Sequence, residues 1–484
     1  MFTCNGNNTM DTWVIGVDKR MKWAACVPAA AATQIKAYVQ QREDVLTYGA
    51  VTGMQCCIEG RMKTYFLVGQ EKEGQADDFA AYMTARHIMA AAMKVGCKEL
   101  AVYVDTLTMK LESLLDGLLY QNYEFIHYKK QKKSCTVGSV NLITACLRGK
   151  EVNSLCYKYS SMYEGIYAAR DFVNMPPNEL TPRKFADAIS ELLQGDTVRV
   201  ACMNKWAVEK LQMGGIIAVG KGSMNPPQVV TVYYEGDAES KEVLGLVGKG
   251  VTYDSGGLSL KSAANQEFMK DDMAGAATVV GVLRALMLLK YPVNIVAVLP
   301  LVENIPSGMA YHVDDIITMY NGLTVEVKNT DAEGRLILAD ALTYAQEKGA
   351  TKLIDLATLT GACVTALGTV RTGMIGNQQE WMNTFFRIAE KNHEKIWQLP
   401  SDAAYDKALQ SRVADLKNTG GREAGAITAG MFLKHFVHPS VPWLHLDIAG
   451  TAFQETPDET GYYGATGVGV KAILEVLRGG RSEG

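Results

Sequence analysis

Short apolar runs that alternate with helical patterns through the second half of the chain constrain its fold more than any other sequence feature. The runs have the length of buried strands, and they are Val229–Tyr234, Leu244–Val251, Asn294–Leu301, Lys352–Ala357 and Trp443–Ile448. Strands separated by helices form βα crossovers, which join parallel neighbours in one sheet. We therefore predict an α/β fold in which this half forms a large domain, with a mostly parallel central sheet flanked by helices.

The rest of the chain predicts a second, smaller domain. At 484 residues the chain is longer than one hydrophobic core usually serves. Before residue 150, strand-like runs such as Trp13–Val17 alternate with helical patterns such as Asp77–Val95. A helix-like stretch then runs to a Pro-Pro pair, where it must end because proline cannot continue a helix. We expect a smaller N-terminal α/β domain (1–150), a linker helix (151–173) and a larger C-terminal domain (174–484).

Composition and charge exclude several classes of function. The chain is 48% apolar and 21% charged with a net charge of −4, so no global basic field attracts nucleic acid. The N-terminus shows no secretory signal, and the apolar stretch Val293–Val302 is shorter than the roughly 18 residues of a membrane helix. Ten scattered cysteines without a CxxC pair are typical of free thiols. We expect a cytoplasmic protein with a small substrate, no membrane contact and no nucleic-acid partner.

Acidic residues gather in three glycine-rich or otherwise apolar segments that follow these strands. Asp254 lies in the loop Val247–Lys261, Asp272 lies near the start of a helical pattern, and Asp331 and Glu333 precede a strongly apolar helix. Open α/β sheets place their sites where strands end. A single such acid is more often a helix N-cap or a solvated carboxylate. Their coincidence in apolar segments favours a shared partner, because unpaired buried charge is costly, and a pair of divalent cations would supply one.

The segment Asn329–Leu336, with the sequence NTDAEGRL, resembles the signature octapeptide of the leucyl aminopeptidase family, the M17 metallopeptidases. Further matches cover the second half of the chain: Asn174–Pro182, Val247–Lys261, Met269–Ala277, Asp355–Ala362, Arg422–Thr428 and His445–Gly450. Residues 1–150 show no such motif, and the family has a variable α/β domain there, with an oligomerisation or regulatory role. The resemblance implies a metal-dependent aminopeptidase that releases single N-terminal amino acids, preferably leucine-like ones, from peptides.

The resemblance also implies a complete site for two divalent metal ions. The five ligands would be Lys249, Asp254, Asp272, Asp331 and Glu333. Asp254 and Glu333 would bridge the ions and Asp331 would hold one of them, while Lys249 with Asp272 would complete the other. Four carboxylates balance two divalent cations, so Lys249 would coordinate as a neutral amine with a depressed pKa. The ions, whether zinc, manganese, magnesium or cobalt, would activate the attacking water and polarise the scissile carbonyl.

Other functional residues of the family match further positions. Lys261 would stabilise the oxyanion, and Arg335 would hold a bicarbonate ion that shuttles the proton of the water. The residues of the substrate cleft and of the pocket for the first side chain would be Met269, Thr358, Leu359, Gly361 and Ala449. One ion would bind the free α-amine of the peptide, which explains why single residues are removed. The family further implies a homohexamer whose active sites face an interior cavity.

Two other classes of function stay open at this point: a DNA-binding regulator that retains the fold, and another two-metal hydrolase such as a phosphatase. The run Gly215–Lys221 fits the first part of a Walker A loop, but Gly222 replaces the Ser or Thr that binds magnesium, so we interpret it as strand and turn. The basic run Tyr128–Lys133 is more typical of a solvated loop than of a phosphate contact. Two residues depart from the family pattern: Ala274 stands where glycine is usual, and Asp271 adds an acid.

Overall fold

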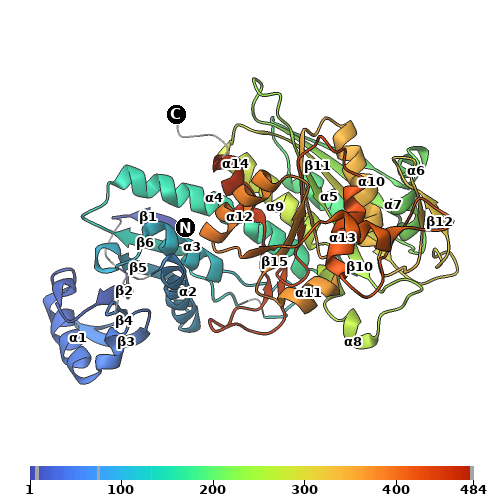
Figure 1. The fold of residues 1–484 in the computed structure, drawn as a ribbon. Coiled ribbons are helices and arrows are strands. Elements are labelled where there is room, and N and C mark those ends of the chain that lie inside the picture. The colour runs from blue at the N-terminus through green and yellow to red at the C-terminus, as the bar shows by residue number, and fades with distance from the viewer. Residues whose placement is uncertain (6–9, 73–76, 132, 480–484) are drawn as a thin grey trace. The chain divides into compact units, whose positions relative to one another are not determined.

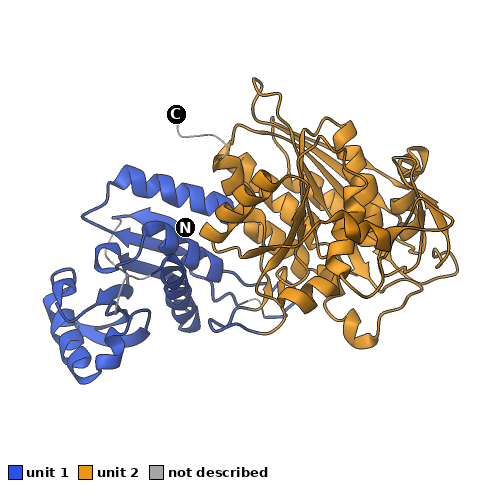
Figure 2. Ribbon diagram, viewed as in Figure 1, with its two compact units in different colours: residues 1–163, 457–462 blue, residues 164–456, 463–484 orange. Residues whose placement is uncertain are grey.

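The computed structural model describes residues 1–5, 10–72, 77–131 and 133–479 (Figure 1). The chain divides into two compact units, of which the first comprises residues 1–163 and 457–462 and the second residues 164–456 and 463–484 (Figure 2). Each unit has its own sheet and helices, which confirms the expected α/β class with two domains. The helix expected over residues 151–173 lies within α4 (Gly149–Asn174), and the expected domain boundaries stay predictions.

A six-stranded sheet organises the first unit, with the strand order β1-β6-β5-β2-β4-β3. Its strands are β1 (Phe2–Cys4), β2 (Thr12–Val17), β3 (Val51–Ile58), β4 (Arg61–Gly69), β5 (Glu99–Tyr103) and β6 (Ser139–Ile143). All neighbours are parallel except β3 and β4, which form an antiparallel hairpin. The helices are α1 (Ala29–Gln41), α2 (Asp78–Lys94) and α3 (Leu111–Gln121). Helix α2 begins after Asp77 because this carboxylate accepts a hydrogen bond from the backbone N–H of Ala80.

A nine-stranded sheet forms the centre of the second unit, in the order β16-β15-β18-β14-β9-β11-β8-β7, with β10 also paired to β11. Its strands are β7 (Val198–Met203), β8 (Gln228–Glu235), β9 (Leu244–Gly248), β10 (Gly250–Asp254), β11 (Asn294–Asn304), β14 (Lys352–Ala357), β15 (Thr372–Gly376), β16 (Ile396–Gln398) and β18 (Trp443–Asp447). The central strands β18, β14, β9, β11 and β10 run parallel. Antiparallel pairs join this centre to β15 and to β8. The mostly parallel sheet that the sequence predicts is therefore present.

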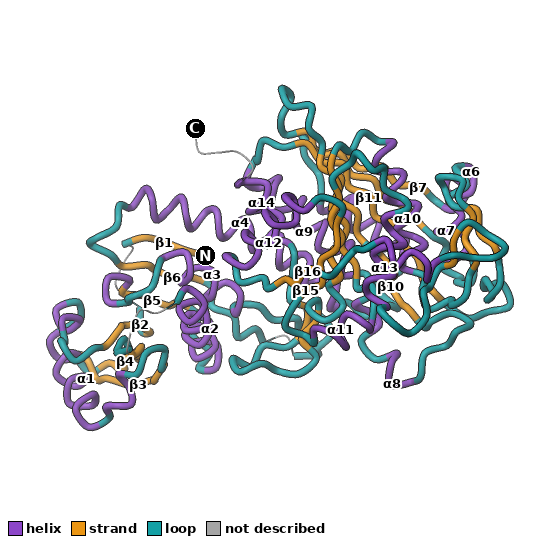
Figure 3. The backbone as a smooth tube through the Cα atoms, viewed as in Figure 1, coloured by secondary structure: helices purple, strands orange, loops and turns teal. Residues whose placement is uncertain are grey.

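Helices lie on both sides of these strands, as Figure 3 shows for α9, α12 and α14 on one side and α10 and α13 on the other. Their bounds are α9 (Ala274–Leu289), α10 (Gly334–Glu347), α12 (Gln379–Lys391), α13 (Gly425–Lys434) and α14 (Val470–Gly479). The other elements of the unit are α5 (Pro182–Leu192), α6 (Lys205–Lys210), α7 (Gly214–Gly220), α8 (Ala263–Gln266), α11 (Gly361–Leu367), β12 (Ile316–Thr318), β13 (Thr324–Glu326), β17 (Leu416–Lys417), β19 (Phe453–Gln454) and β20 (Gly464–Ala465). Leu336 of α10 packs with Val247 and Val298 of the sheet in one buried core, so α10 is held firmly against the strands.

The apolar run Leu244–Val251 is interrupted at Lys249, between β9 and β10. The backbone N–H of Lys249 donates to Leu356 at 3.0 Å, and its carbonyl accepts from Ala276 at 2.9 Å. The first turn of α9, through the backbone N–H of Ala276, is thus bonded to a backbone carbonyl between β9 and β10. This exchange ties α9 to the sheet at the residue that the sequence marks as a metal ligand.

Helix α9 is the core helix of the second unit. The stretch Ala263–Leu289 is apolar and long enough, by length and composition, to cross a bilayer, but 78% of its most apolar window is buried inside the protein, as in the core helix of a globular domain. A Cβ on Gly275 would lie 2.0 Å from the carbonyl oxygen of Leu356, so only glycine permits this approach.

The interpretation of Gly215–Lys221 as strand and turn is wrong, because these residues belong to α7 and the turn after it. A short apolar run does not distinguish a buried strand from a buried helix, and here the chain packs against α10 and β11 as a helix. Gly214 and Gly215 permit this packing, since a Cβ on either would lie within 2.4 Å of a backbone carbonyl oxygen, that of Thr318 or that of Leu336. Lys132, in the run Tyr128–Lys133, lies outside the described residues.

Candidate metal centre

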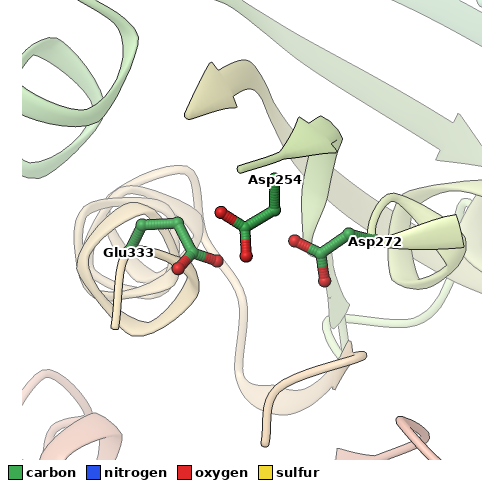
Figure 4. A group of neighbouring side chains, drawn as sticks. All are labelled: Asp254, Asp272 and Glu333. Atoms are coloured by element: carbon green, nitrogen blue, oxygen red, sulfur yellow. The ribbon is translucent and has the colours of Figure 1, made fainter. Parts of the chain in front are cut away.

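Three carboxylates from separate segments of the second unit converge at one place (Figure 4). Asp254 is the last residue of β10, Asp272 lies two residues before α9, and Glu333 directly precedes α10. Each offers an oxygen that lies within 4.8 Å of the others, and none is more than 5% exposed. The structure therefore brings together three of the predicted ligands: Asp254 after a strand, Asp272 near the start of one helix and Glu333 before another.

Lys249 lies among these acids. Its Nζ is 2.6 Å from Asp272 Oδ1 and 3.0 Å from Glu333 Oε1, and it donates to the carbonyl of Thr358 at 2.8 Å. A Cβ on Gly334 would lie 2.6 Å from Lys249 Cε. The glycine that follows Glu333 in the octapeptide therefore leaves room for the lysine.

Lys261 links Asp331, the remaining predicted ligand, to the other acids through Asp254. Its Nζ lies 2.6 Å from Asp254 Oδ2 and forms a second ion pair with Asp331. Asp331 is the most exposed of the four acids, with a side chain that is 33% accessible. The structure thus brings all five predicted ligands and Lys261 into one cluster, in which each lysine contacts two carboxylates.

Burial and mutual repulsion change the ionisation of the cluster. Burial raises the pKa of Asp254 to about 6 and raises that of Asp272 further above its ordinary value. Burial also acts on Glu333, but Lys249 and Lys261 outweigh it and hold the pKa of Glu333 below its usual range. For Lys249, burial favours the neutral amine, whereas the three acids around it favour the ammonium and raise its pKa overall. The lowered pKa expected for Lys249 refers to the metal-bound site and stays a prediction.

The donors of this cluster fit divalent cations. Asp272 Oδ2 is buried and has no hydrogen-bond partner among the described residues, and an unpaired buried carboxylate oxygen is costly. The donor set is rich in carboxylate oxygens, which hard and borderline divalent ions prefer. Four acids, three of them buried, beside one amine would balance the charge of two divalent ions.

Polar residues that the sequence analysis missed orient the ligands. Asn304, at the end of β11, donates from Nδ2 to Asp254 Oδ1 at 2.8 Å and to the carbonyl of Thr330 at 3.0 Å. Asn418 is fully buried and donates to the carbonyl of Asn329 at 2.7 Å. A polar residue that ends an apolar strand could have indicated Asn304, but no local pattern marks Asn418.

Arg335 lies in the first turn of α10, two residues after Glu333. It is 7% exposed and donates from one terminal nitrogen to the carbonyl of Asn418 at 2.9 Å, while its Nε has no partner among the described residues. Burial lowers the pKa of Arg335 to about 10, against the opposing effect of Glu333, Asp447 and Asp331. A buried guanidinium with a free N–H is a site for an anion or for water.

The predicted substrate residues lie at the ends of β14 and β18 and in the turn before α9. Thr358 donates to Asp272 Oδ1 at 2.9 Å and so contacts the cluster directly. Leu359 and Ala449 both donate their backbone N–H to Asp447. Gly361 begins α11 and a Cβ there would meet no neighbour within 4 Å, so the space above it is open. Met269 is half-buried in the 3-10 turn Met269–Asp271, close to Asp272 in sequence.

The two departures from the family pattern leave the cluster intact. Asp271 is 8% exposed, and burial raises its pKa to about 7, but its carboxylate is not one of the three that converge. Ala274 is 2% exposed at the start of α9. The position that must be glycine is the next one, Gly275, because of its approach to the carbonyl of Leu356.

Comparisons with known proteins agree with this geometry. Residues 167–474 match the sequence profile of the cytosol aminopeptidase family, catalytic domain. A probable cytosol aminopeptidase of Alkaliphilus oremlandii is 42% identical over 76% of this chain and 74% of its own length, and one of Geobacter sp. is 38% identical over 85% of both. Among solved structures, the bottromycin maturation enzyme BotP in complex with Mn is 32% identical, with a TM-score of 0.85 over 97% of this chain and 99% of its own. A mutant of tomato leucine aminopeptidase is 29% identical, with a TM-score of 0.85 over 99% and 96% of the two chains.

Proposed function

This chain belongs to the cytosol aminopeptidase family and is a metal-dependent aminopeptidase, and from that premise we propose that its buried carboxylate cluster holds two divalent ions that act on N-terminal leucine-like residues. The convergence of Asp254, Asp272 and Glu333, with one buried oxygen of Asp272 unpaired, is the observation that carries the proposal. Asp254 and Glu333 would be shared by the two ions, and Asp331 would complete the ligands of one of them.

Lys249 and Asp272 would complete the ligands of the other ion, to which Lys249 would bind as a neutral amine. Its proton must leave when the ions enter, because a protonated amine has no lone pair for coordination. When bound, the ions supply a nucleophilic water at neutral pH, polarise the scissile carbonyl and bind the free α-amine of the substrate. The titration of Lys249 therefore couples metal affinity to pH.

Lys261 stabilises the negative charge that develops on the carbonyl oxygen of the substrate. Its Nζ contacts Asp254 and Asp331 in this structure, and these two acids keep the pKa of Lys261 high against the effect of burial. The ammonium thus stays charged through the reaction and is positioned by two groups before the substrate binds. Positioned charge of this kind often makes a large contribution to catalysis.

Arg335 would hold a bicarbonate ion, which would supply a base for the proton of the attacking water. The free Nε and the buried position of Arg335 support an anion there. The guanidinium itself cannot serve as the base, since it does not give up its proton readily. Thr358, Leu359 and Gly361 line the cleft, and Met269 and Ala449 form the apolar pocket that prefers leucine-like first residues.

The family further supports a homohexamer in the cytoplasm, in which the first unit has an oligomerisation or regulatory role. The relatives are named cytosol aminopeptidases, which agrees with a cytoplasmic location. Zinc, manganese, magnesium and cobalt are all candidates for the site, and the Mn complex of BotP supports manganese among them. The comparisons give no support to a DNA-binding regulator.

Hydrolysis of a panel of aminoacyl amides, beside their N-acetylated forms and a phosphate monoester, tests the proposal. We expect cleavage of the free-amine substrates, fastest for leucyl or methionyl amides, and loss of activity on chelation. Equal cleavage of the acetylated forms, or activity that withstands chelation, would contradict it. Cleavage of the phosphate monoester alone would assign the site to a different two-metal hydrolase.

A further inference from the structure

The carboxylate of Asp447, the last residue of β18, binds two separate segments of the second unit. Its Oδ1 accepts hydrogen bonds from the backbone N–H of Leu359 at 3.1 Å and of Ala449 at 3.2 Å. Its Oδ2 accepts from the hydroxyl of Thr360 at 2.7 Å. Both oxygens are therefore bonded, and all three donors belong to segments that leave the carboxyl ends of β14 and β18.

Asp447 is 2% exposed, so its charge must be compensated inside the protein. The three hydrogen bonds supply part of this compensation. Two buried basic groups act at longer range, since Asp447 is among the acids that oppose the effect of burial on the pKa of Arg335 and on that of His445. A buried carboxylate that depends on backbone donors fixes those donors in turn, because each bond lost leaves part of the charge uncompensated.

The two segments approach the metal cluster from different strands. In the sheet register, Asp447 lies beside Ala357, the last residue of β14. The chain that follows Ala357 first contacts the cluster through the hydroxyl of Thr358, which donates to Asp272, and then contacts Asp447 through Leu359 and Thr360. The carboxylate of Asp447 thus links the cluster-bound loop after β14 to the segment after β18, beside the backbone bond from Ile448 N–H to the carbonyl of Ala357 at 2.8 Å.

We propose that Asp447 is a positioning residue for substrate selection, which holds Leu359 of the cleft and Ala449 of the apolar pocket at a fixed separation. This inference rests on the proposed function, since that function places Leu359 and Ala449 beside the substrate. The shared carboxylate sets the distance between Leu359 of the cleft and Ala449 of the pocket. Its loss removes this common anchor for the two backbone N–H groups, while the metal ligands and the backbone bond between Ile448 and Ala357 keep their own contacts.

The test compares leucyl and alanyl amides as substrates of the metal-loaded enzyme. In Asp447→Ala we expect the ratio of kcat/KM for the leucyl over the alanyl amide to fall by roughly 10-fold or more, mainly through KM, because a misplaced pocket wall affects the larger side chain most. The metal content per chain stays as in the wild type. Asp447→Asn restores most of the ratio, since its amide oxygen accepts from the two backbone N–H groups and its NH2 donates to Thr360.

Asp355→Ala is the matched control, because Asp355 is a fully buried carboxylate on the neighbouring strand β14 that binds Trp443 and His445 and no pocket residue. It should lower Tm without changing the leucyl-to-alanyl ratio. An unchanged ratio in Asp447→Ala, or an equal change in Asp355→Ala, would overturn the inference.

A measurement on the wild-type protein keeps the inference testable if Asp447→Ala does not fold. The backbone amide hydrogens of Leu359 and Ala449 should exchange with solvent more slowly than those of other loop residues. Exchange at the rate of unbonded loop amides would overturn the inference. A wild-type enzyme that cleaves no aminoacyl amide would contradict the proposed function, whereas a normal wild-type enzyme with an unaffected Asp447→Ala ratio would contradict the role of Asp447 alone.

Discussion

Glu333 lies directly before α10 and in contact with Lys249. If Glu333 bridges both ions, its loss removes an oxygen from each coordination set, whereas the loss of Asp331 affects one set. We expect Glu333→Ala to bind neither ion tightly and Asp331→Ala to retain one per chain, as metal analysis after gel filtration would show. The kcat of Glu333→Ala should fall by more than about 100-fold, beyond the usual effect of removing an outer-shell partner. Retention of two ions by Glu333→Ala would contradict the bridging role.

Asp340 provides a pH-dependent contribution to stability that is separate from the metal centre. It is fully buried on α10 and accepts hydrogen bonds from the backbone N–H of Tyr320 and of Ile216, and burial raises its pKa to about 7. The folded protein therefore binds this proton more tightly than the unfolded chain, whose aspartate pKa is near 3.9. The contribution is present below about pH 4 and is lost as the pH rises through 7.

We expect the Tm of the wild type to exceed that of Asp340→Asn by less at pH 8.5 than at pH 5.5. The full effect of such a shift is on the order of 4 kcal/mol, since each pKa unit corresponds to about 1.36 kcal/mol. The Tm to compare is that of the transition in which the second unit unfolds, because a chain with two compact units need not unfold in one step. A difference in Tm between the wild type and Asp340→Asn that increases with pH would contradict the prediction, because it would show that ionisation of Asp340 stabilises the fold.

At the scale of elements, the contact between α9 and the sheet predicts a strict requirement at one glycine. A Cβ on Gly275 would lie 2.0 Å from the carbonyl oxygen of Leu356 and 2.9 Å from the backbone nitrogen of Lys249. We expect Gly275→Ala to lower the free energy of unfolding by about 1–3 kcal/mol, as overpacking usually does, and to weaken metal binding by displacing Lys249. Ala274→Gly is the control, since it removes a methyl without a clash. Thermal denaturation and metal analysis would compare both variants with the wild type. A Tm of Gly275→Ala equal to that of the wild type would contradict the argument.

The elements also show how far sequence reasoning reaches. Lys352–Ala357 was predictable as a strand to the residue, because its apolar pattern is local. The break at Lys249 was not, since it depends on hydrogen bonds to Leu356 and Ala276, far away in the chain. The helix α7 was missed because its packing against α10 decides its structure.

Local sequence motifs mark the predicted ligands of the site, whereas no local motif marks the residues that support them. Asp254, Asp272 and Glu333 lie in compact motifs that a sequence displays directly. Asn304 contacts Asp254 across 50 residues, and Asp447 contacts Leu359 across 88. Such contacts exist only once the sheet has formed, so neither residue has a signature of its own in one sequence.

At the scale of the whole molecule, the division into units follows contacts more than chain order. Residues 457–462 belong to the first unit although they lie near the C-terminus. Within that unit Arg86 forms an ion pair with Asp458, and the hydroxyl of Thr460 donates to Gln121 at 2.7 Å. A domain boundary predicted from strand and helix patterns alone could not assign residues 457–462 to the first unit.

The metal-free charge balance of the second unit predicts how the molecule responds to chelation. Lys249 contacts Asp272 and Glu333, and Lys261 contacts Asp254 and Asp331, so each acid keeps a cation without the ions. We expect a chelator to abolish activity reversibly and to lower Tm without unfolding the protein. An ion that binds only the folded state at 1,000 times its Kd contributes about 4 kcal/mol, which corresponds to a drop of several degrees.

Lys261→Met makes this prediction specific, because it removes the cation between Asp254 and Asp331. With the ions bound, the two acids are compensated in both proteins, so the Tm values of the loaded forms should lie close together. After chelation the variant has two carboxylates that face each other without a cation, and its Tm should fall further than that of the wild type. Scanning calorimetry of the loaded and chelated forms measures both drops. Equal drops in the two proteins would mean that Lys261 does not replace the ions as a counter-charge.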